Sequence, residues 1–154
     1  MPECLFCQIA AGNIPCHKIY EDENVLAFLD IHPLNPGHTQ IIPKKHSGHL
    51  LEADEIDARA IMDAAKKITP AILQCVGAPG CNFHSNIGRA AGQVIFHTHV
   101  HLIPRYADDG FQDWERTGEV SDGLASVAER IRDFLKDDGC ADGICSVKNN
   151  DEKK

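Results

Sequence analysis

Three histidines stand at alternate positions within the segment 96–105, at His97, His99 and His101. Successive side chains of a β-strand point to opposite faces of a sheet, so a strand here would place all three imidazoles on one face. Neighbours two residues apart lie roughly 7 Å from each other, near enough to act together on one small anion or one metal ion. We therefore take this segment as the candidate active site.

Two kinds of chemistry fit these residue types. In a zinc hydrolase, His97, His99 and a third ligand would hold a metal ion that keeps one position open. In phosphoryl transfer, a neutral imidazole would attack phosphorus, a neighbour would orient its second nitrogen, and another histidine would assist the leaving group. The turn Ala91-Gly92-Gln93 directly upstream favours phosphorus chemistry, because glycine lets the backbone approach phosphate oxygens closely.

The composition narrows the class of protein. The chain has 154 residues, enough for one domain with a sizeable core, and a net charge of -8, which argues against broad binding to nucleic acid or to a membrane surface. A small anionic substrate still fits if local cations gather, and the candidates are Lys44, Lys45, Arg89 and Arg105. The sequence has no apolar run long enough for a transmembrane helix and no secretory signal, so we expect the cytoplasm.

The cysteines fit the same compartment. Seven cysteines without a secretory signal indicate reduced thiols or metal ligands before disulfides. Cys4 and Cys7 form a lone C-x-x-C pair, which alone is a weak indication of zinc, and two small apolar residues on a short helix would explain it as well.

The pattern of the remaining elements predicts an α+β fold. We expect a short helical turn over 4–11, strands over 18–21, 25–29 and 39–42, and a helix that Asp54 caps and that Pro70 kinks or breaks. A strand over 81–87 and a tight turn over 88–92 should form an antiparallel hairpin with the histidine strand. Ser121 should cap a C-terminal helix with one apolar face, and 138–154 has the composition of a disordered tail.

The histidine segment, His97-Thr98-His99-Val100-His101-Leu102-Ile103, resembles the defining motif of the histidine-triad (HIT) nucleotide hydrolases and transferases. The resemblance extends over residues 4–106 and is closest to Hint-like members of bacterial type. The further blocks that match, in the same order, are Cys4-Leu5-Phe6-Cys7, Phe28-Leu29-Asp30, Asn35-Pro36-Gly37-His38, Ile42-Pro43-Lys44-Lys45-His46, Asn86-Ile87-Gly88, Ala91-Gly92-Gln93 and Ile103-Pro104-Arg105.

The resemblance implies a single HIT domain with a helical extension over 1–137 and a role for each histidine. His99 would attack the α-phosphorus to give a covalent nucleotidyl-histidine, His101 would assist departure of the leaving group, and the backbone carbonyl of His97 would accept from Nδ1 of His99. Asn86, Gly92 and Gln93 would contact the phosphate, Asp30 would accept both ribose hydroxyls, and the apolar residues Phe6, Ile9, Phe28 and Ile31 would pack the purine or simply fill the core.

The resemblance also implies a substrate, a metal site and an assembly. The substrate would be a purine nucleotide conjugate (a phosphoramidate, an acyl-adenylate or a dinucleoside polyphosphate), cleaved without a cofactor to release AMP or GMP. Cys4, Cys7, His46 and His97 would hold a structural zinc ion, and two chains would form a homodimer with a continuous sheet.

Two departures from the family's pattern leave the specificity open. Val94 stands where Hint members often have a serine that contacts the leaving group, which puts a phosphoramidate preference in doubt. The chain after Tyr106 does not match the short Hint ending. The alternative from another class is a nucleotide-binding regulatory or adaptor module with negligible turnover.

Overall fold

The computed structural model describes residues 4–112, 114 and 123–136. The chain divides into two units, Met1–Phe111 and Gln112–Lys154, which are described separately. The second contains the expected C-terminal helix, α3 (Leu124–Lys136), whereas the expected Ser121 cap and the tail 138–154 lie outside the described residues. None of the helices in the described ranges is long and apolar enough to cross a membrane.

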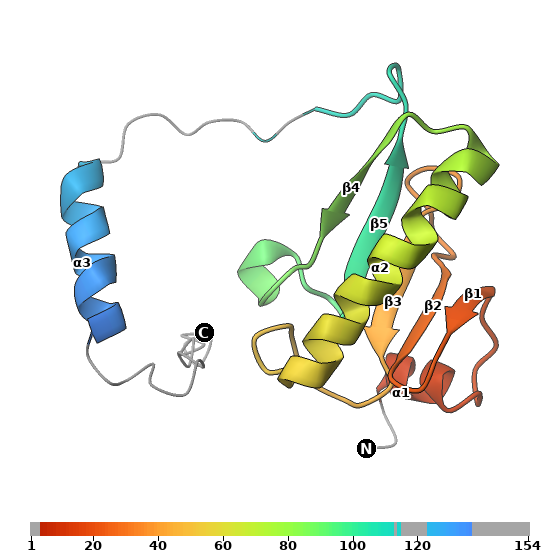
Figure 1. Ribbon diagram of the computed structural model, residues 1–154, viewed down its shortest axis with the longest axis horizontal. Coiled ribbons are helices and arrows are strands. Elements are labelled where there is room, and N and C mark those ends of the chain that lie inside the picture. The colour runs from red at the N-terminus through yellow and green to blue at the C-terminus, as the bar shows by residue number, and fades with distance from the viewer. Residues whose placement is uncertain (1–3, 113, 115–122, 137–154) are drawn as a thin grey trace. The chain divides into compact units, whose positions relative to one another are not determined.

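Five antiparallel strands form the sheet of the first unit (Figure 1). They are β1 (Lys18–Glu21), β2 (Val25–Leu29), β3 (Thr39–Pro43), β4 (Gly80–His84) and β5 (Val100–Arg105). Their order in space is β1-β2-β3-β5-β4, so the last strand of the chain lies inside the sheet and β4 is an edge. The α+β prediction with about five antiparallel strands is confirmed.

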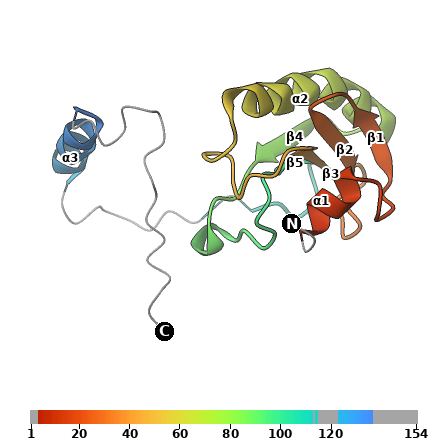
Figure 2. The same ribbon diagram turned by 90° about the horizontal axis from the view of Figure 1, so that it is seen from below.

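The long helix α2 (Glu55–Val76) covers one face of this sheet, as the two views show (Figures 1 and 2). It begins as expected, because the Asp54 side chain accepts a hydrogen bond from the backbone N–H of Asp57 at 2.9 Å. Of the expected kink or break at Pro70, the break is wrong, since the helix is continuous to Val76. Pro70 lies on the exposed side of the helix, where water can satisfy the backbone carbonyl that proline leaves without a donor.

The alternation of side chains along the strands gives the sheet two different faces. Toward α2, residues such as Val25, Ile41 and Leu102 build the main core with Ile61 of the helix. On the opposite face, the short helix α1 (Leu5–Ala10) buries Phe6 in a second apolar cluster, which also contains Leu26, Phe28 and Ile42. His101 follows the same alternation and belongs to this second face, so the candidate site lies opposite α2.

The connection between β4 and β5 differs from the expected hairpin. The two strands pair antiparallel, with His84 opposite His101, but β4 ends at His84 and β5 begins only at Val100. The segment 85–99 therefore replaces the tight turn, and it contains the 3-10 helix η1 (Arg89–Ala91). Five of the predicted site residues lie in this long segment: Asn86, Gly92, Gln93, His97 and His99.

Candidate active site

Of the three histidines, only His101 lies in a strand. Before Val100, backbone groups that could pair with a neighbouring strand instead form hydrogen bonds with a side chain and with another loop. The N–H of Thr98 donates to the carbonyl of Ser47 at 2.7 Å, and the carbonyl of His99 accepts from the Ser85 hydroxyl at 2.7 Å. The expectation of one continuous histidine strand is thus wrong for its first half. The rings of His97 and His99 nevertheless both pack against Phe6, with centroids 5.9 and 5.3 Å away. The ring of His97 also reaches Cys4 and Cys7 at the start of α1.

His99 is held with one ring nitrogen engaged. Its Nδ1 lies 2.7 Å from the carbonyl oxygen of His97, and because a carbonyl only accepts, Nδ1 carries the hydrogen. A neutral His99 therefore keeps its lone pair on Nε2. The side chain is 6% exposed, and its ring packs edge-to-face against the rings of Phe6 and His101, with centroids 5.3 and 5.1 Å away. This is the arrangement of an oriented neutral nucleophile.

A chain of hydrogen bonds fixes the tautomer of His101. The backbone N–H of Leu34 donates to Nδ1 of His38 at 3.2 Å, so a neutral His38 carries its proton on Nε2. That Nε2 lies 2.9 Å from Nδ1 of His101 and donates to it. His101 is left with its hydrogen on Nε2, the nitrogen available to a leaving group.

Burial keeps this pair of histidines neutral. It lowers the pKa of His101 to about 4, and the neighbouring His99, His38 and His84 lower it in the same direction. Burial also lowers the pKa of His38, against the opposing effect of Asp30. His84 stacks on His101 with ring centroids 5.0 Å apart. Sequence reasoning assigned His38 and His84 no role; the pairing of β4 with β5 brings in His84, and the buried His38 reaches His101 across the sheet.

The low pKa of His101 has a measurable consequence for stability. Between pH 6.5 and about 4 the unfolded chain binds a proton at this position and the folded chain does not, so the free energy of unfolding should fall as the pH falls through that window. Urea titrations at several pH values measure this slope. His101→Asn keeps an acceptor for His38 and should flatten the slope, whereas the same change at the exposed His17 should leave it unaltered. An equal slope in His101→Asn and the wild type would contradict the assignment.

The four residues implied as zinc ligands come together. Nδ1 of His97 lies 3.4 Å from Sγ of Cys4, 3.5 Å from Sγ of Cys7 and 3.3 Å from Nδ1 of His46. A tetrahedron with bonds of roughly 2.0–2.3 Å to zinc has edges of about 3.3–3.8 Å, so these separations fit. Nε2 of His97 donates to the carbonyl of Pro43 at 2.9 Å, which leaves Nδ1 as a free lone pair facing the thiols.

A second cluster, Asp30, His38 and His101, has ligand atoms within 4.8 Å of one another but does not fit a metal ion as well. A metal on Nε2 of His38 would move the proton of the neutral ring to Nδ1, where it would face the N–H of Leu34. The hydrogen-bonded relay described above needs no such change. The two clusters therefore differ in their tautomers. In the cluster with the cysteines, Nδ1 of His97 has a lone pair that can bind a metal ion, whereas Nε2 of His101 carries a hydrogen.

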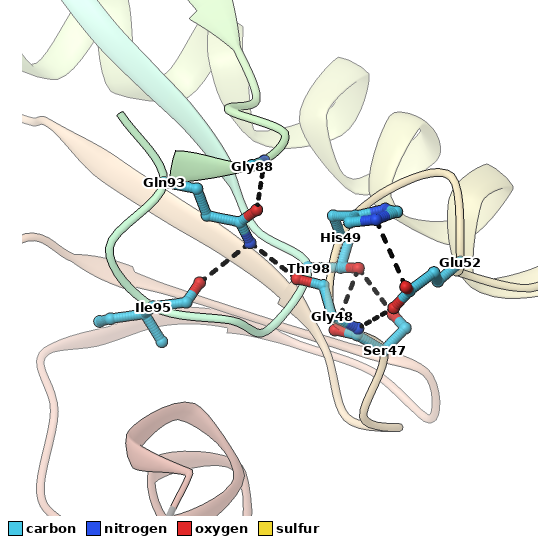
Figure 3. A network of polar contacts seen from close by, with 8 residues as sticks. All are labelled: Ser47, Gly48, His49, Glu52, Gly88, Gln93, Ile95 and Thr98. Carbon is cyan, nitrogen blue, oxygen red and sulfur yellow. Dashed lines mark hydrogen bonds and ion pairs between the residues drawn. The ribbon is translucent and has the colours of Figure 1, made fainter. Parts of the chain in front are cut away.

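Gln93 is tied to three backbone segments rather than open to solvent (Figure 3). Its Oε1 accepts from the N–H of Gly88 at 2.9 Å, and its Nε2 donates to the carbonyls of Gly48 and Ile95 at 2.7 and 3.1 Å. With the side chain 3% exposed, every polar hydrogen of the amide is engaged. In this arrangement Gln93 joins the segment 85–99 to the loop after His46, and a phosphate contact from its side chain would require these bonds to open.

The amide of Asn86 is open to a ligand, whereas the backbone N–H of Gly92 donates to the carbonyl of Arg89 at 2.9 Å. The amide of Asn86 has no hydrogen-bond partner among the described residues, and it lies beside Gly92, where a Cβ would be 3.6 Å from its Nδ2. Gly92 has φ +84°, a conformation that L side chains rarely adopt, so glycine is required in this turn. Asn86 therefore offers a neutral donor, and Gly92 offers a turn without a side chain beside it.

The cations do not gather at the site. Lys44 pairs with Glu21 at 2.9 Å, Lys45 with Asp54 at 2.7 Å and Arg105 with Asp109 at 2.6 Å. Arg89 is exposed and its guanidinium lies 4.9 Å from the centroid of the Phe96 ring. An anion at this site would therefore meet neutral donors and histidines before lysines.

The residues expected to bind the nucleoside lie on the same face. Asp30 follows β2 directly, and its carboxylate accepts from the N–H of His32 at 2.8 Å. Phe6 and Phe28 are buried and pack edge-to-face with centroids 5.8 Å apart, so both belong to the second core. Ile31 is 76% exposed, next to Asp30.

Comparison with known proteins agrees with this geometry. The family model described as HIT domain matches residues 11–108. The chain belongs to the HIT family. The structure is similar to that of a solved family member, a Zn-bound histidine triad protein from Mycobacterium smegmatis. The TM-score is 0.68, and the two sequences are 34% identical, with 86% of this chain and 97% of that one covered.

Two relatives of this HIT protein have named activities. Adenylylsulfatase HINT3 of Arabidopsis thaliana is 45% identical over 107 residues, which are 70% of this chain and 54% of the relative. Adenosine 5'-monophosphoramidase hnt1 of Schizosaccharomyces pombe is 41% identical over 102 residues, which are 66% of this chain and 74% of the relative. Both names describe proteins that act on an adenylyl group with different leaving groups.

Proposed function

We propose that this HIT protein hydrolyses nucleotide conjugates at the α-phosphorus through a covalent intermediate on His99. The observation that supports this most is the 2.7 Å contact between Nδ1 of His99 and the carbonyl of His97, which directs Nε2 of this buried ring away from that carbonyl. His99 would supply the nucleophile, His101 the leaving-group donor and Asn86 a phosphate donor.

The reaction has two balanced steps. In the first, the lone pair on Nε2 of His99 forms a bond to phosphorus while the bond to the leaving group breaks, and the N–H at Nε2 of His101 stabilises the departing atom. In the second, water attacks the nucleotidyl-histidine, the electron pair of the P–N bond returns to Nε2, and the nucleoside monophosphate leaves. The proton that water loses passes through the solvent to the leaving group, which departed with the electron pair of its bond to phosphorus. The histidine is regenerated, so the cycle needs no cofactor.

The substrate we propose is a purine nucleotide conjugate, with AMP or GMP as the product. The named activities of the two relatives support an adenylyl group, and they differ in the leaving group. Asp30 would accept the ribose hydroxyls, and Asn86 would donate to the phosphate. Gly92, which has no side chain, would let the phosphate approach the backbone closely. Gln93 would hold the segment that contains both residues. Ile31, with Phe6 and Phe28 beneath, would border the base.

The choice of leaving group is open to a direct experiment. Initial rates on an adenosine phosphoramidate, an acyl-adenylate, a dinucleoside triphosphate and a dinucleoside tetraphosphate should show release of AMP from at least one of them. Val94 is 83% exposed and has no hydroxyl to offer, so we expect no strong preference for an amine leaving group. Tight binding of AMP with no turnover on any member of the panel would favour the adaptor alternative instead.

We further propose that Cys4, Cys7, His46 and His97 hold a structural zinc ion. The set of donors is closed, with four protein ligands and no open position for substrate, which is typical of a structural site. The Zn-bound relative is consistent with this. Reduced thiols as ligands also suit the cytoplasm, the compartment we expect.

The edge strand β4 supports a homodimer as the assembly. Next to it lies an open groove of about 420 Å³, lined by Met62, Ala65, Lys66, Thr69, Pro70, Cys81 and Phe83. Phe83 is 40% exposed on the edge strand itself, where a second copy could extend the sheet.

Replacement of Phe83 by lysine should therefore convert a dimer into a monomer, because a charge would be buried in the apolar contact. Light scattering after size exclusion should give twice the chain mass for the wild type and 16.9 kDa for the variant. Ile19, 42% exposed on β1 at the opposite edge of the sheet, is the matched position for a control substitution to lysine. A wild-type chain that elutes as a monomer at micromolar concentration would contradict the proposal.

A further inference from the structure

Gln40 is a polar residue in the middle of β3, on the face of the sheet that carries the candidate site. In the antiparallel register it lies opposite Phe28 on β2 and opposite His101 on β5. It thus stands between the proposed base border and the proposed leaving-group donor. No role for it followed from the motifs of the sequence.

The amide of Gln40 holds one side of the Asp30 carboxylate. Its Nε2 donates to Oδ2 of Asp30 at 2.5 Å, while the N–H of His32 donates to Oδ1 at 2.8 Å. The backbone N–H of Asp30 also donates to the carbonyl of His38 at 2.9 Å. One donor on each oxygen prevents the carboxylate from rotating, and each oxygen keeps a further lone pair for a ligand.

The carboxylate is ionised in this setting. Burial by itself would raise the pKa of Asp30, but the hydrogen bonds from His32 and Gln40 outweigh burial and lower the pKa, with smaller contributions from His38 and His101. A charged acceptor of fixed orientation, one residue beyond the end of β2, suits a pair of vicinal hydroxyl groups.

The other end of the amide opposes any stability that this hydrogen bond contributes. Its Oε1 is buried and has no hydrogen-bond partner among the described residues. Rotating the amide would not help, because it would place Oε1 against the charged oxygen of Asp30. A buried acceptor without a donor destabilises a fold, so an apolar residue of the same length would serve the core better.

We infer that Gln40 is a positioning residue for sugar recognition: it orients the carboxylate of Asp30 toward the 2'- and 3'-hydroxyls and so makes the site selective for ribonucleotides over 2'-deoxyribonucleotides. The inference rests on the proposed function, since Asp30 is a ribose acceptor only there. Preorganisation of one hydrogen-bonded group by a second is the physical basis.

The test replaces Gln40 by methionine, which keeps the length of the side chain and removes its hydrogen-bonding groups. Isothermal titration with AMP and with 2'-deoxy-AMP measures both affinities without turnover, and thermal unfolding measures stability. The wild type should bind AMP about tenfold more tightly than 2'-deoxy-AMP, the size expected for one hydrogen bond to a charged group. In Gln40→Met, AMP should bind about tenfold more weakly, 2'-deoxy-AMP nearly as before, and Tm should stay the same or rise.

Gln74→Met makes the same chemical change on the exposed side of α2 and should alter neither affinity nor their ratio. If Gln40 only packed against its neighbours, Gln40→Met would lower Tm and weaken the binding of both nucleotides equally, and that result overturns the inference. An unchanged ratio of the two affinities in Gln40→Met overturns it as well.

Asp30→Asn separates this inference from the function it rests on. If the asparagine variant keeps the wild-type ratio of the two affinities, or if the wild type binds neither nucleotide, the ribose site itself is absent and the inference falls with it. If Asp30→Asn abolishes the preference and Gln40→Met does not, only the role of Gln40 is overturned.

Discussion

Replacement of His99 by alanine is expected to abolish turnover and to leave nucleotide binding nearly intact. In His99, Nδ1 donates to the carbonyl of His97, so Nε2 is the nitrogen that can attack. His101 cannot replace it as the nucleophile, because its Nδ1 accepts a hydrogen bond from His38. Loss of a covalent nucleophile lowers kcat by roughly 10⁴-fold or more. In the proposed function, binding would depend on Asp30 and Asn86, which the substitution does not touch.

The measurement is single-turnover hydrolysis of an active conjugate together with titration of AMP. Because the ring of His99 packs against Phe6, alanine leaves a cavity, so His99→Asn provides a second variant that fills part of the space and still donates to the carbonyl of His97. His17→Ala, at an exposed position, is the matched control and should keep full activity. Substantial turnover in both His99 variants would exclude the proposed mechanism.

The second large effect concerns the cysteine and histidine cluster. Purified protein should contain one zinc ion per chain, and a chelator should lower Tm by about 10–20 °C, because a tightly bound ligand of the native state contributes several kcal/mol to its stability. The cluster connects α1 to the loop after β3 and to the segment before β5, so its loss loosens three parts of the fold at once.

Turnover distinguishes this structural role from a catalytic one. In the chelated protein, assayed below its lowered Tm, activity should fall by no more than about tenfold, through weaker support of the His97 carbonyl. The double variant Cys4→Ser, Cys7→Ser should contain no zinc, and its Tm should equal that of the chelated wild type with or without the chelator. Cys75→Ser changes an exposed thiol and should keep the zinc ion. Complete and zinc-reversible loss of activity would instead favour the zinc hydrolase that the residue types alone also allowed.

Local patterns were enough to predict most of the elements of this fold. The alternation of apolar residues located the strands, and Asp54 marked the start of α2 correctly. The order of the strands was not predictable in this way, because the insertion of β5 between β3 and β4 depends on contacts between segments far apart in the chain. The continuous helix at Pro70 shows a second limit: exposure, which no local pattern states, decides whether a proline is tolerated.

The candidate site likewise has features that the sequence predicted and features that only the structure shows. Spacing alone brought out His97, His99 and His101, and the family resemblance assigned them unequal roles. It could not show that His38 sets the tautomer of His101 or that Gln40 donates to Asp30, because each depends on a hydrogen bond between side chains from different segments. The Gln93 amide is a further case, since its type suits a phosphate donor and only the structure shows that its hydrogens are already engaged.

The central claim is that a nucleotide becomes covalently attached to His99, and trapping that species tests it most directly. A reaction with an adenylyl conjugate is quenched in its first turnover, and the intact protein and its peptides are analysed by mass spectrometry. The account predicts a mass increase of one adenylyl group on the wild-type chain, located at His99 and lost in His99→Asn. A conjugate that is hydrolysed in the same experiment with no adduct, or with the adduct on another residue, would contradict it.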